Sequence, residues 1–150
     1  MIAYAITNLA AFFVITLAGR ELKSDQINSY RGLAKRSPFL AGILFVALLS
    51  LAGVPPLAGF FGKFLILLGA VRGGLAWLAF IGALGVAVSL YYYLSIVRAM
   101  YIDPSTNENP IVLNSSSKFL LLFLTLGILL IGLWQAPFFH FAEFAANSLF

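Results

Sequence analysis

Long apolar runs separated by polar connections define the organisation of this chain. The runs cover residues 1–19, 38–71, 75–101 and 118–136. A helix rises about 1.5 Å per residue, so a run of about twenty residues can cross a hydrocarbon core of about 30 Å. The pattern predicts an all-α integral membrane protein with a single transmembrane region of about four helices.

The second run is too long for one straight helix. Residues 38–71 would extend for about 50 Å, and the sequence Gly53-Val54-Pro55-Pro56 lies near their middle. Proline rings clash with the preceding helical turn, and proline has no N–H to donate. We therefore expect a discontinuous helix that is broken at these four residues.

The break has two consequences for the backbone. Carbonyl groups one turn earlier, near Leu51 and Ala52, lose their helical partners and need water or a side chain instead. The chain then either continues in the same direction as a single broken crossing or folds back at the prolines as a re-entrant hairpin. A single crossing is the favoured interpretation, and the hairpin is the alternative.

The first polar connection, residues 20–37, contains a short helical pattern. Ser24 or Asp25 is suited to cap such a helix. Apolar side chains recur there at helical spacing, at Ile27, Tyr30 and Leu33. This pattern predicts a short helix that lies along the membrane interface.

Loop charges predict the orientation of the chain. With a single broken crossing, residues 20–37 and 102–117 lie on the same side of the membrane, and Arg72 lies on the other. Basic residues concentrate on cytoplasmic sides. Seven of them lie in or beside these two loops: Arg20, Lys23, Arg31, Lys35, Arg36, Arg98 and Lys118. We therefore expect both loops to be cytoplasmic and both termini to lie on the opposite side, in a bacterial inner membrane.

Composition agrees with a membrane protein and narrows its chemistry. Hydrophobic residues make up 62% of the chain and charged residues 9%, against about 25% charged residues in soluble domains. The chain has no cysteine and one histidine, so neither a thiolate metal site nor a histidine cluster is expected. No feature predicts a bound metal, a bound cofactor or a nucleic-acid partner.

Lys63 is the only charge between residues 39 and 71. It precedes Arg72 by nine residues, or about 13 Å of helix, which places it close to the middle of the membrane. Ionisable groups at this depth usually face a protein interior or a water-filled path. A low-dielectric environment disfavours the charged ammonium, so such a lysine can load and release a proton.

Two structural interpretations of Lys63 compete with proton transfer. A snorkelling lysine would place its ammonium group at the interface, but a side chain of about 6 Å is too short to reach the interface easily from the estimated depth. A structural ion pair would need a carboxylate at membrane depth. The acidic residues all lie in loops or in the C-terminal tail, at Glu21, Asp25, Asp103, Glu108 and Glu143. Proton transfer is the favoured interpretation, with Lys63 as the proton-translocating residue.

Other polar or small residues are candidates for lining a proton path. Tyr4, Thr7 and Asn8 lie in the first apolar run, where they either line a hydrated path or form hydrogen bonds between helices. Gly59 and Gly62 flank Lys63, where they either admit water or serve helix packing. The three consecutive tyrosines at 91–93 are interpreted as an interfacial belt rather than a proton relay.

Residues 49–64, LSLAGVPPLAGFFGKF, resemble the antiporter-type membrane subunits of respiratory complex I. The wider pattern is similar to subunit N of proton-translocating NADH–quinone oxidoreductases. It includes YAITNLAAF at 4–12, YRGL at 30–33, and SLYYYL at 89–94 with Arg98 and Tyr101 following. The resemblance covers nearly the whole chain but only the C-terminal portion of such a subunit.

This resemblance implies a role for Lys63. It corresponds to the lysine of a discontinuous helix in a proton half-channel, whereas M-type relatives usually carry glutamate at this position. L-type relatives continue into a long lateral helix that is not found here. Cation/proton antiporter subunits share the Pro-Pro and lysine region, so a multisubunit antiporter is an alternative. A structural scaffold subunit, in which Lys63 binds the carbonyl groups stranded near the prolines, is a second alternative.

The resemblance also implies partners. The chain would be a non-redox subunit of the NADH:quinone oxidoreductase, without catalytic activity alone. NADH, FMN, iron–sulfur clusters and quinone would bind to partner subunits. The expected partners are the other membrane subunits, the missing N-terminal part of this subunit, and the lipid bilayer.

Overall fold

The computed structural model describes residues 2–24, 26–105 and 109–134, and these are helical with short connections. The helices follow in the order α1 (Ile2–Leu22), η1 (Ile27–Tyr30), α2 (Leu33–Arg36), α3 (Pro38–Ala52), α4 (Ala58–Arg72), α5 (Ala76–Tyr101) and α6 (Ser115–Leu133). Three of them, α1, α5 and α6, are long and apolar enough to cross a membrane, and α3 is a shorter apolar helix. The predicted all-α membrane fold is confirmed.

The long second run forms two helices, α3 and α4, of fifteen residues each. Ser37 begins α3 by accepting a hydrogen bond from the Leu40 N–H at 3.5 Å, and Pro38 occupies the first turn, where its missing N–H is not needed. Gly53 ends α3 with a left-handed φ of 86°, a conformation that glycine adopts without a steric cost. The interruption expected at residues 53–56 is present, and Pro55–Pro56 is a cis peptide bond.

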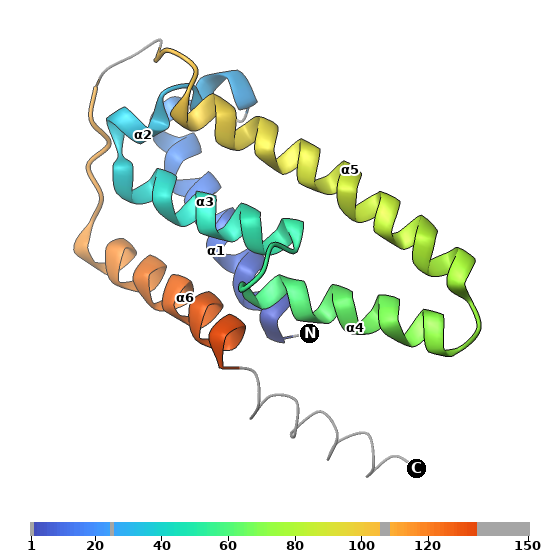
Figure 1. Cartoon of the computed structure of the whole chain (residues 1–150). Coiled ribbons are helices and arrows are strands. Elements are labelled where there is room, and N and C mark those ends of the chain that lie inside the picture. The colour runs from blue at the N-terminus through green and yellow to red at the C-terminus, as the bar shows by residue number, and fades with distance from the viewer. Residues whose placement is uncertain (1, 25, 106–108, 135–150) are drawn as a thin grey trace.

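The two halves of the broken helix run in the same general direction. Figure 1 shows α4 continuing beyond the end of α3, and α5 returning alongside both. A re-entrant hairpin would instead turn α4 back along α3. The arrangement is that of a single broken helix.

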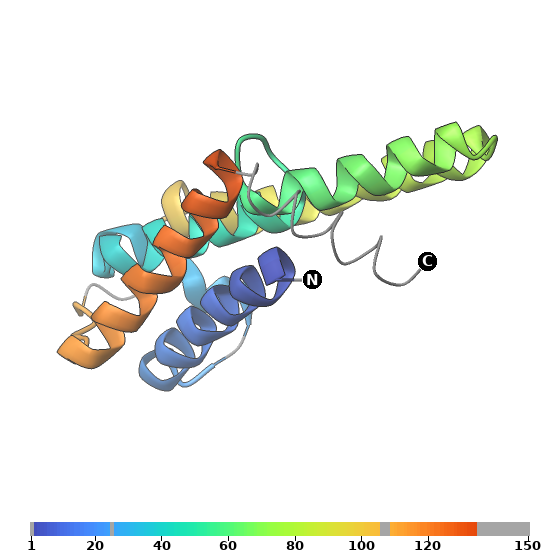
Figure 2. The ribbon, with the colours of Figure 1, turned by 90° about the horizontal axis from the view of Figure 1, so that it is seen from below.

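The core lies between α1, α3 and α6. Most of its buried side chains come from these three helices, and others come from η1, α2, the start of α4, the end of α5 and the second polar loop. The largest include Val14, Leu40, Leu44, Met100, Leu121 and Ile128. Figure 2 shows that α4 and α5 form a hairpin that projects beyond this core. The broken helix therefore joins a packed region to a projecting one.

Helix α6 crosses close to the segment that joins the two half-helices. A Cβ atom added to Gly132 would overlap the Pro56 carbonyl oxygen and meet the Leu57 carbonyl carbon and the Ala58 nitrogen at 2.8 Å. Only glycine permits this approach of two backbones. The joining segment is consequently held between the end of α3 and the last turn of α6.

The two polar loops lie together at one end of the molecule. The Gly32 N–H donates to the Ala99 carbonyl at 3.0 Å, and Arg36 Nε donates to the Asn109 carbonyl at 2.9 Å. Arg31 and Asp103 form an ion pair of 3.4 Å. The loops share one end, as the charge pattern predicts, while the side of the membrane that they face stays a prediction.

The helix expected in the first connection differs from the observed structure. The segment forms a 3-10 helix, η1, and a separate short helix, α2, because Gly32 between them has a left-handed φ of 67°. Tyr30 and Leu33 are buried in the core rather than turned toward lipid. Ser24 Oγ accepts the Gln26 N–H at 3.3 Å, and Asp25 lies outside the described residues.

Several helix boundaries also differ from the predicted ones. Helix α1 continues to Leu22, past the polar residues that suggested an end near residue 19. Helix α6 begins at Ser115 and ends at Leu133, so the end predicted at residue 136 lies outside the described residues. Helical backbone hydrogen bonds continue through polar residues, so the end of an apolar run does not mark the end of a helix.

Candidate functional site at the helix break

Lys63 binds the backbone groups that the helix break leaves without partners. Its Nζ donates hydrogen bonds to the carbonyl oxygens of Leu51, at 2.6 Å, and Ala52, at 3.3 Å. These are the carbonyl groups that the proline pair was expected to strand. A cation at the C-terminal end of a helix is also favoured by the helix dipole, so Lys63 caps α3.

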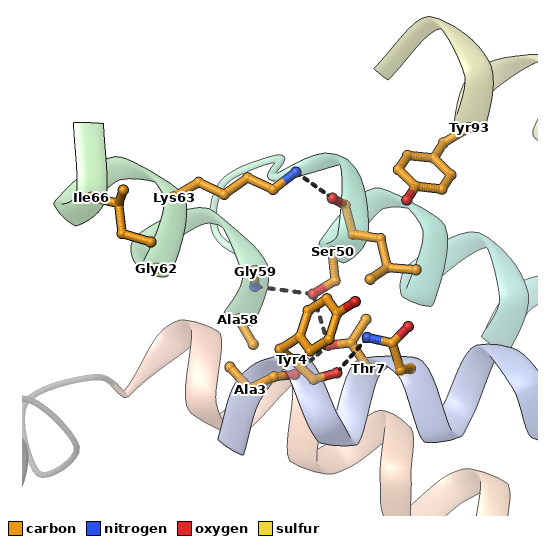
Figure 3. A pocket seen from close by; sticks show the side chains of 12 residues that line it. Ala3, Tyr4, Thr7, Ser50, Ala58, Gly59, Gly62, Lys63, Ile66 and Tyr93 are labelled. Atoms are coloured by element: carbon orange, nitrogen blue, oxygen red, sulfur yellow. Dashed lines mark hydrogen bonds between the residues drawn. The ribbon is translucent and has the colours of Figure 1, made fainter. Parts of the chain in front are cut away.

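Close backbone packing brings Lys63 within reach of α3. A Cβ atom at Gly59 would overlap the Ser50 carbonyl oxygen, so only glycine allows the first turn of α4 to lie against the last turn of α3. A Cβ atom at Gly53 would lie 3.1 Å from Lys63 Cδ. Figure 3 shows the extended Lys63 side chain crossing from α4 to the end of α3.

A buried pair of hydroxyl groups lies beside this contact. Ser50 Oγ accepts the Gly59 N–H at 3.1 Å and lies 3.2 Å from Thr7 Oγ1. Thr7 Oγ1 donates to the Ala3 carbonyl at 2.7 Å. Both hydroxyl-bearing side chains are almost fully buried. The pair connects α1, α3 and α4 at the break.

A cavity of about 380 Å³ brings together most of the residues singled out in the sequence. Tyr4, Thr7, Asn8, Gly59, Gly62 and Lys63 all contribute to its lining, with Ser50 and Tyr93 among the others. The helix-break residues Gly53, Pro55 and Pro56 are not part of that lining. Several hydroxyl and amide groups are present, which is what a hydrated site needs.

The predicted lining residues are not equivalent. Thr7 is buried and bound to Ser50, whereas the Tyr4 side chain is 66% exposed at the rim. Asn8 uses its amide N–H to bind the Tyr4 carbonyl of its own helix at 2.8 Å. Gly62 has open space where a Cβ would lie, so its absence of a side chain leaves room in the cavity.

Two polar cavity residues, Ser50 and Tyr93, were missed in the sequence analysis. Ser50 stands in an apolar run, and no spacing marks it as different from a serine that binds its own helix. Tyr93 was assigned to an interfacial belt with its neighbours, but it lines the cavity and is half-buried, while Tyr91 is 79% exposed. Adjacent residues of a helix point in different directions, so Tyr91, Tyr92 and Tyr93 could not all face the same surroundings. That difference was the available signal in the sequence.

No carboxylate pairs with Lys63 among residues 2–24, 26–105 and 109–134. Glu21 lies at the loop end of α1, and Asp103 lies between Arg31 and Arg98, at 3.4 and 3.8 Å. No group of three or more metal-ligating side chains occurs in the same part of the chain. Within these residues Lys63 Nζ is therefore bound by backbone carbonyl groups, and a protonated lysine has a third N–H that can bind water in the cavity.

Residues 1–89 match the family described as NADH:quinone oxidoreductase/Mrp antiporter, TM. The chain is 39% identical to NADH-quinone oxidoreductase subunit N of Heliobacterium modesticaldum over 98% of this chain and 31% of that protein. It is 40% identical to the subunit N of Desulfitobacterium hafniense over 99% of this chain and 30% of that protein. The chain thus spans about 30% of the length of these curated relatives.

A solved structure shows the same arrangement of helices. A chain of respiratory complex I from Thermus thermophilus, determined with bound aureothin, matches with a TM-score of 0.71 and 30% sequence identity. The match covers 89% of this chain and 32% of that chain.

Proposed function

The chain belongs to the NADH:quinone oxidoreductase/Mrp antiporter transmembrane family, and on this premise we propose that it forms part of the membrane arm of a proton-translocating NADH:quinone oxidoreductase. Its contribution is the half-channel at the broken helix, where Lys63 loads and releases a proton. The observation that carries this proposal is the position of Lys63, which lines a cavity that also contains hydroxyl and amide groups, while its Nζ binds two carbonyl oxygens at the break.

The site tolerates both protonation states of a lysine. As an ammonium, Lys63 is solvated by the Leu51 and Ala52 carbonyl groups, which offsets part of the cost of a charge at membrane depth. As a neutral amine, it keeps two N–H donors for the same carbonyl groups. The cavity supplies room for the water that would deliver or accept the proton.

The proton partner of Lys63 would come from outside the described residues. The curated relatives are about three times as long as this chain, so we propose that the remaining helices of such a subunit, other membrane subunits and lipid complete the path. NADH, FMN, iron–sulfur clusters and quinone would bind to partner subunits. In a bacterial inner membrane, loops 20–37 and 102–117 would face the cytoplasm.

Replacing Lys63 tests the proposal. In membranes that contain the assembled complex, Lys63→Ala should lower NADH-driven proton translocation by at least about tenfold, because acid–base groups contribute factors of about 10² or more. Arg72→Ala, at the other end of the same helix, is the matched control and should leave translocation unchanged. Normal translocation in an assembled Lys63→Ala complex would refute the proposal.

A structural role for Lys63 is the second candidate, and the two hydrogen bonds to Leu51 and Ala52 favour it. If Lys63 only joins the half-helices, Lys63→Ala prevents assembly, whereas Lys63→Gln restores both assembly and translocation. Proton loading predicts that Lys63→Gln assembles but does not translocate. The amount of assembled complex on a native gel, measured beside translocation, separates the two candidates.

The antiporter alternative has less support. The family description includes Mrp antiporters, but the relatives reported above are named subunit N of NADH-quinone oxidoreductase. Sodium/proton exchange in membrane vesicles without NADH would favour the antiporter. NADH-dependent proton uptake that does not require sodium would favour the oxidoreductase.

A further inference from the structure

We propose that Ser50 is a positioning residue for Lys63 and that the buried Ser50–Thr7 pair does not carry protons. The inference rests on the proposed function for the role of Lys63. It begins with the direction of the hydrogen bonds. Thr7 has one hydroxyl hydrogen and gives it to the Ala3 carbonyl, which can only accept. In the Ser50–Thr7 contact, Ser50 is therefore the donor.

The resulting chain has a single direction. The Gly59 N–H donates to Ser50 Oγ, Ser50 donates to Thr7, and Thr7 donates to the Ala3 carbonyl. A proton relay needs a proton source at one end and an acceptor that can pass the proton on at the other. Here the ends are a backbone amide and a backbone carbonyl. The chain holds three helices together and offers no route for a proton.

Ser50 also supplies the cap that α4 lacks. The residue at the N-terminal cap of α4 is Leu57, whose side chain has no oxygen. The first N–H groups of a helix need an acceptor, and Ser50 of α3 provides one to Gly59. Lys63 of α4 in turn binds the last carbonyl groups of α3. Each half-helix thus caps the other.

The two caps act on the same face of α4. Gly59 and Lys63 are separated by one helical turn, so their positions lie on one side of the helix. Ser50 holds that side against α3, and this contact keeps Lys63 Nζ within reach of Leu51 and Ala52. Loss of the Ser50 hydroxyl should therefore loosen Lys63 without removing any group that titrates.

Amide exchange and lysine labelling test the positioning role in the full chain in lipid nanodiscs. In Ser50→Ala, hydrogen exchange at the Gly59 amide should accelerate about fivefold to tenfold, the effect of one lost hydrogen bond. The rate at which a membrane-permeable amine reagent modifies Lys63 should rise. The pH at which this labelling rate is half-maximal should also shift. Ser89→Ala removes a hydroxyl that binds only its own helix, at the Gly85 carbonyl, and is the matched control. Unchanged exchange and labelling in Ser50→Ala would overturn the proposal.

Thr7 variants test the claim about proton transfer. Thr7→Val should lower proton translocation less than Ser50→Ala does, and Thr7→Ser, which keeps the hydroxyl, should match the unmodified protein. Thr16→Val is the control, because Thr16 binds the Phe12 carbonyl of α1 at 2.8 Å in the same way. If Thr7→Val stops translocation while Gly59 exchange and Lys63 labelling stay unchanged, the pair is a proton route. Failure of the proposed function, seen as translocation in Lys63→Ala, leaves the exchange and labelling results valid.

Discussion

The two halves of the broken helix have equal length but are held in different ways. Eight of the fifteen residues of α3 are buried, whereas in α4 only Ala58 is buried. Helix α3 lies within the core with α1 and α6, and α4 projects with α5 (Figures 1 and 2). Packing of buried side chains holds α3 in place. Helix α4 is held by hydrogen bonds and close contacts at its own first turns. The difference indicates that α4, which carries Lys63, is the half better suited to move.

Removing core packing should have the largest effect on stability. Leu44→Ala in α3 should lower the free energy of unfolding by about 3 kcal/mol, because Leu44 is fully buried and its loss leaves a cavity. Leu65→Ala, the same change on the partly exposed α4, should cost less than about 1 kcal/mol. Denaturation by SDS in mixed micelles measures both values. Similar losses in the two variants would mean that packing does not distinguish the half-helices.

Separating the half-helices should have the next largest effect. Gly59→Ala inserts a methyl group into the Ser50 carbonyl, so we expect a loss of about 2–3 kcal/mol, the cost of overpacking. Proton translocation should fall with it, because Lys63 moves away from Leu51. Gly62→Ala, on the same helix, meets open space and is the control. A Gly59→Ala protein with unchanged stability would show that the close approach is not needed.

A smaller effect is expected inside the cavity. Tyr93→Phe removes a hydroxyl that can bind cavity water, so proton translocation should fall about twofold to fivefold, the effect of one neutral hydrogen bond. Tyr91→Phe alters an exposed neighbour and should have no effect. NADH-driven translocation measured in parallel compares the two. Equal translocation in Tyr93→Phe and Tyr91→Phe would show that Tyr93 has no role in the cavity.

The smallest effect is expected at the loop end, far from the join. Asp103→Asn removes the carboxylate between Arg31 and Arg98, which are both exposed. Exposed ion pairs contribute little, so the loss in unfolding free energy should stay below about 1 kcal/mol and should shrink further at high salt. Unfolding at low and high ionic strength measures it. A larger loss that salt does not reduce would show that this ion pair helps to hold the segment between η1 and α2 against the end of α5.

Much of the fold could be predicted from apolar runs and prolines. The break at Gly53 follows from local chemistry, because two prolines stop any helix, and the need of the Leu51 and Ala52 carbonyl groups for partners follows from the same rule. The resemblance of residues 49–64 to complex I subunits agrees with the matched family and relatives. Which donor binds these carbonyl groups depends on tertiary structure. Proton transfer was the favoured interpretation of Lys63, and binding to these carbonyl groups belonged to the scaffold alternative.

Other features depend on contacts that the sequence pattern does not contain. Ser50 and Thr7 are separated by 43 positions and meet only because α1 packs against α3. From the sequence, Gly59 is equally suited to admit water or to allow close helix packing. The structure shows close packing against the Ser50 carbonyl oxygen. Gly62, three residues later, has open space. The two glycines differ because only one faces α3.

The contact between Gly132 and the Pro56–Ala58 segment limits the angle at which α4 can follow α3. Because the backbone of α6 already touches this segment, any change in the angle between α3 and α4 would have to carry α4 away from α6. The contact therefore limits that angle on one side only. A larger side chain at residue 132 would push this segment away from α6 and change the angle of α4 and α5, without altering Lys63 or the other residues that line the cavity.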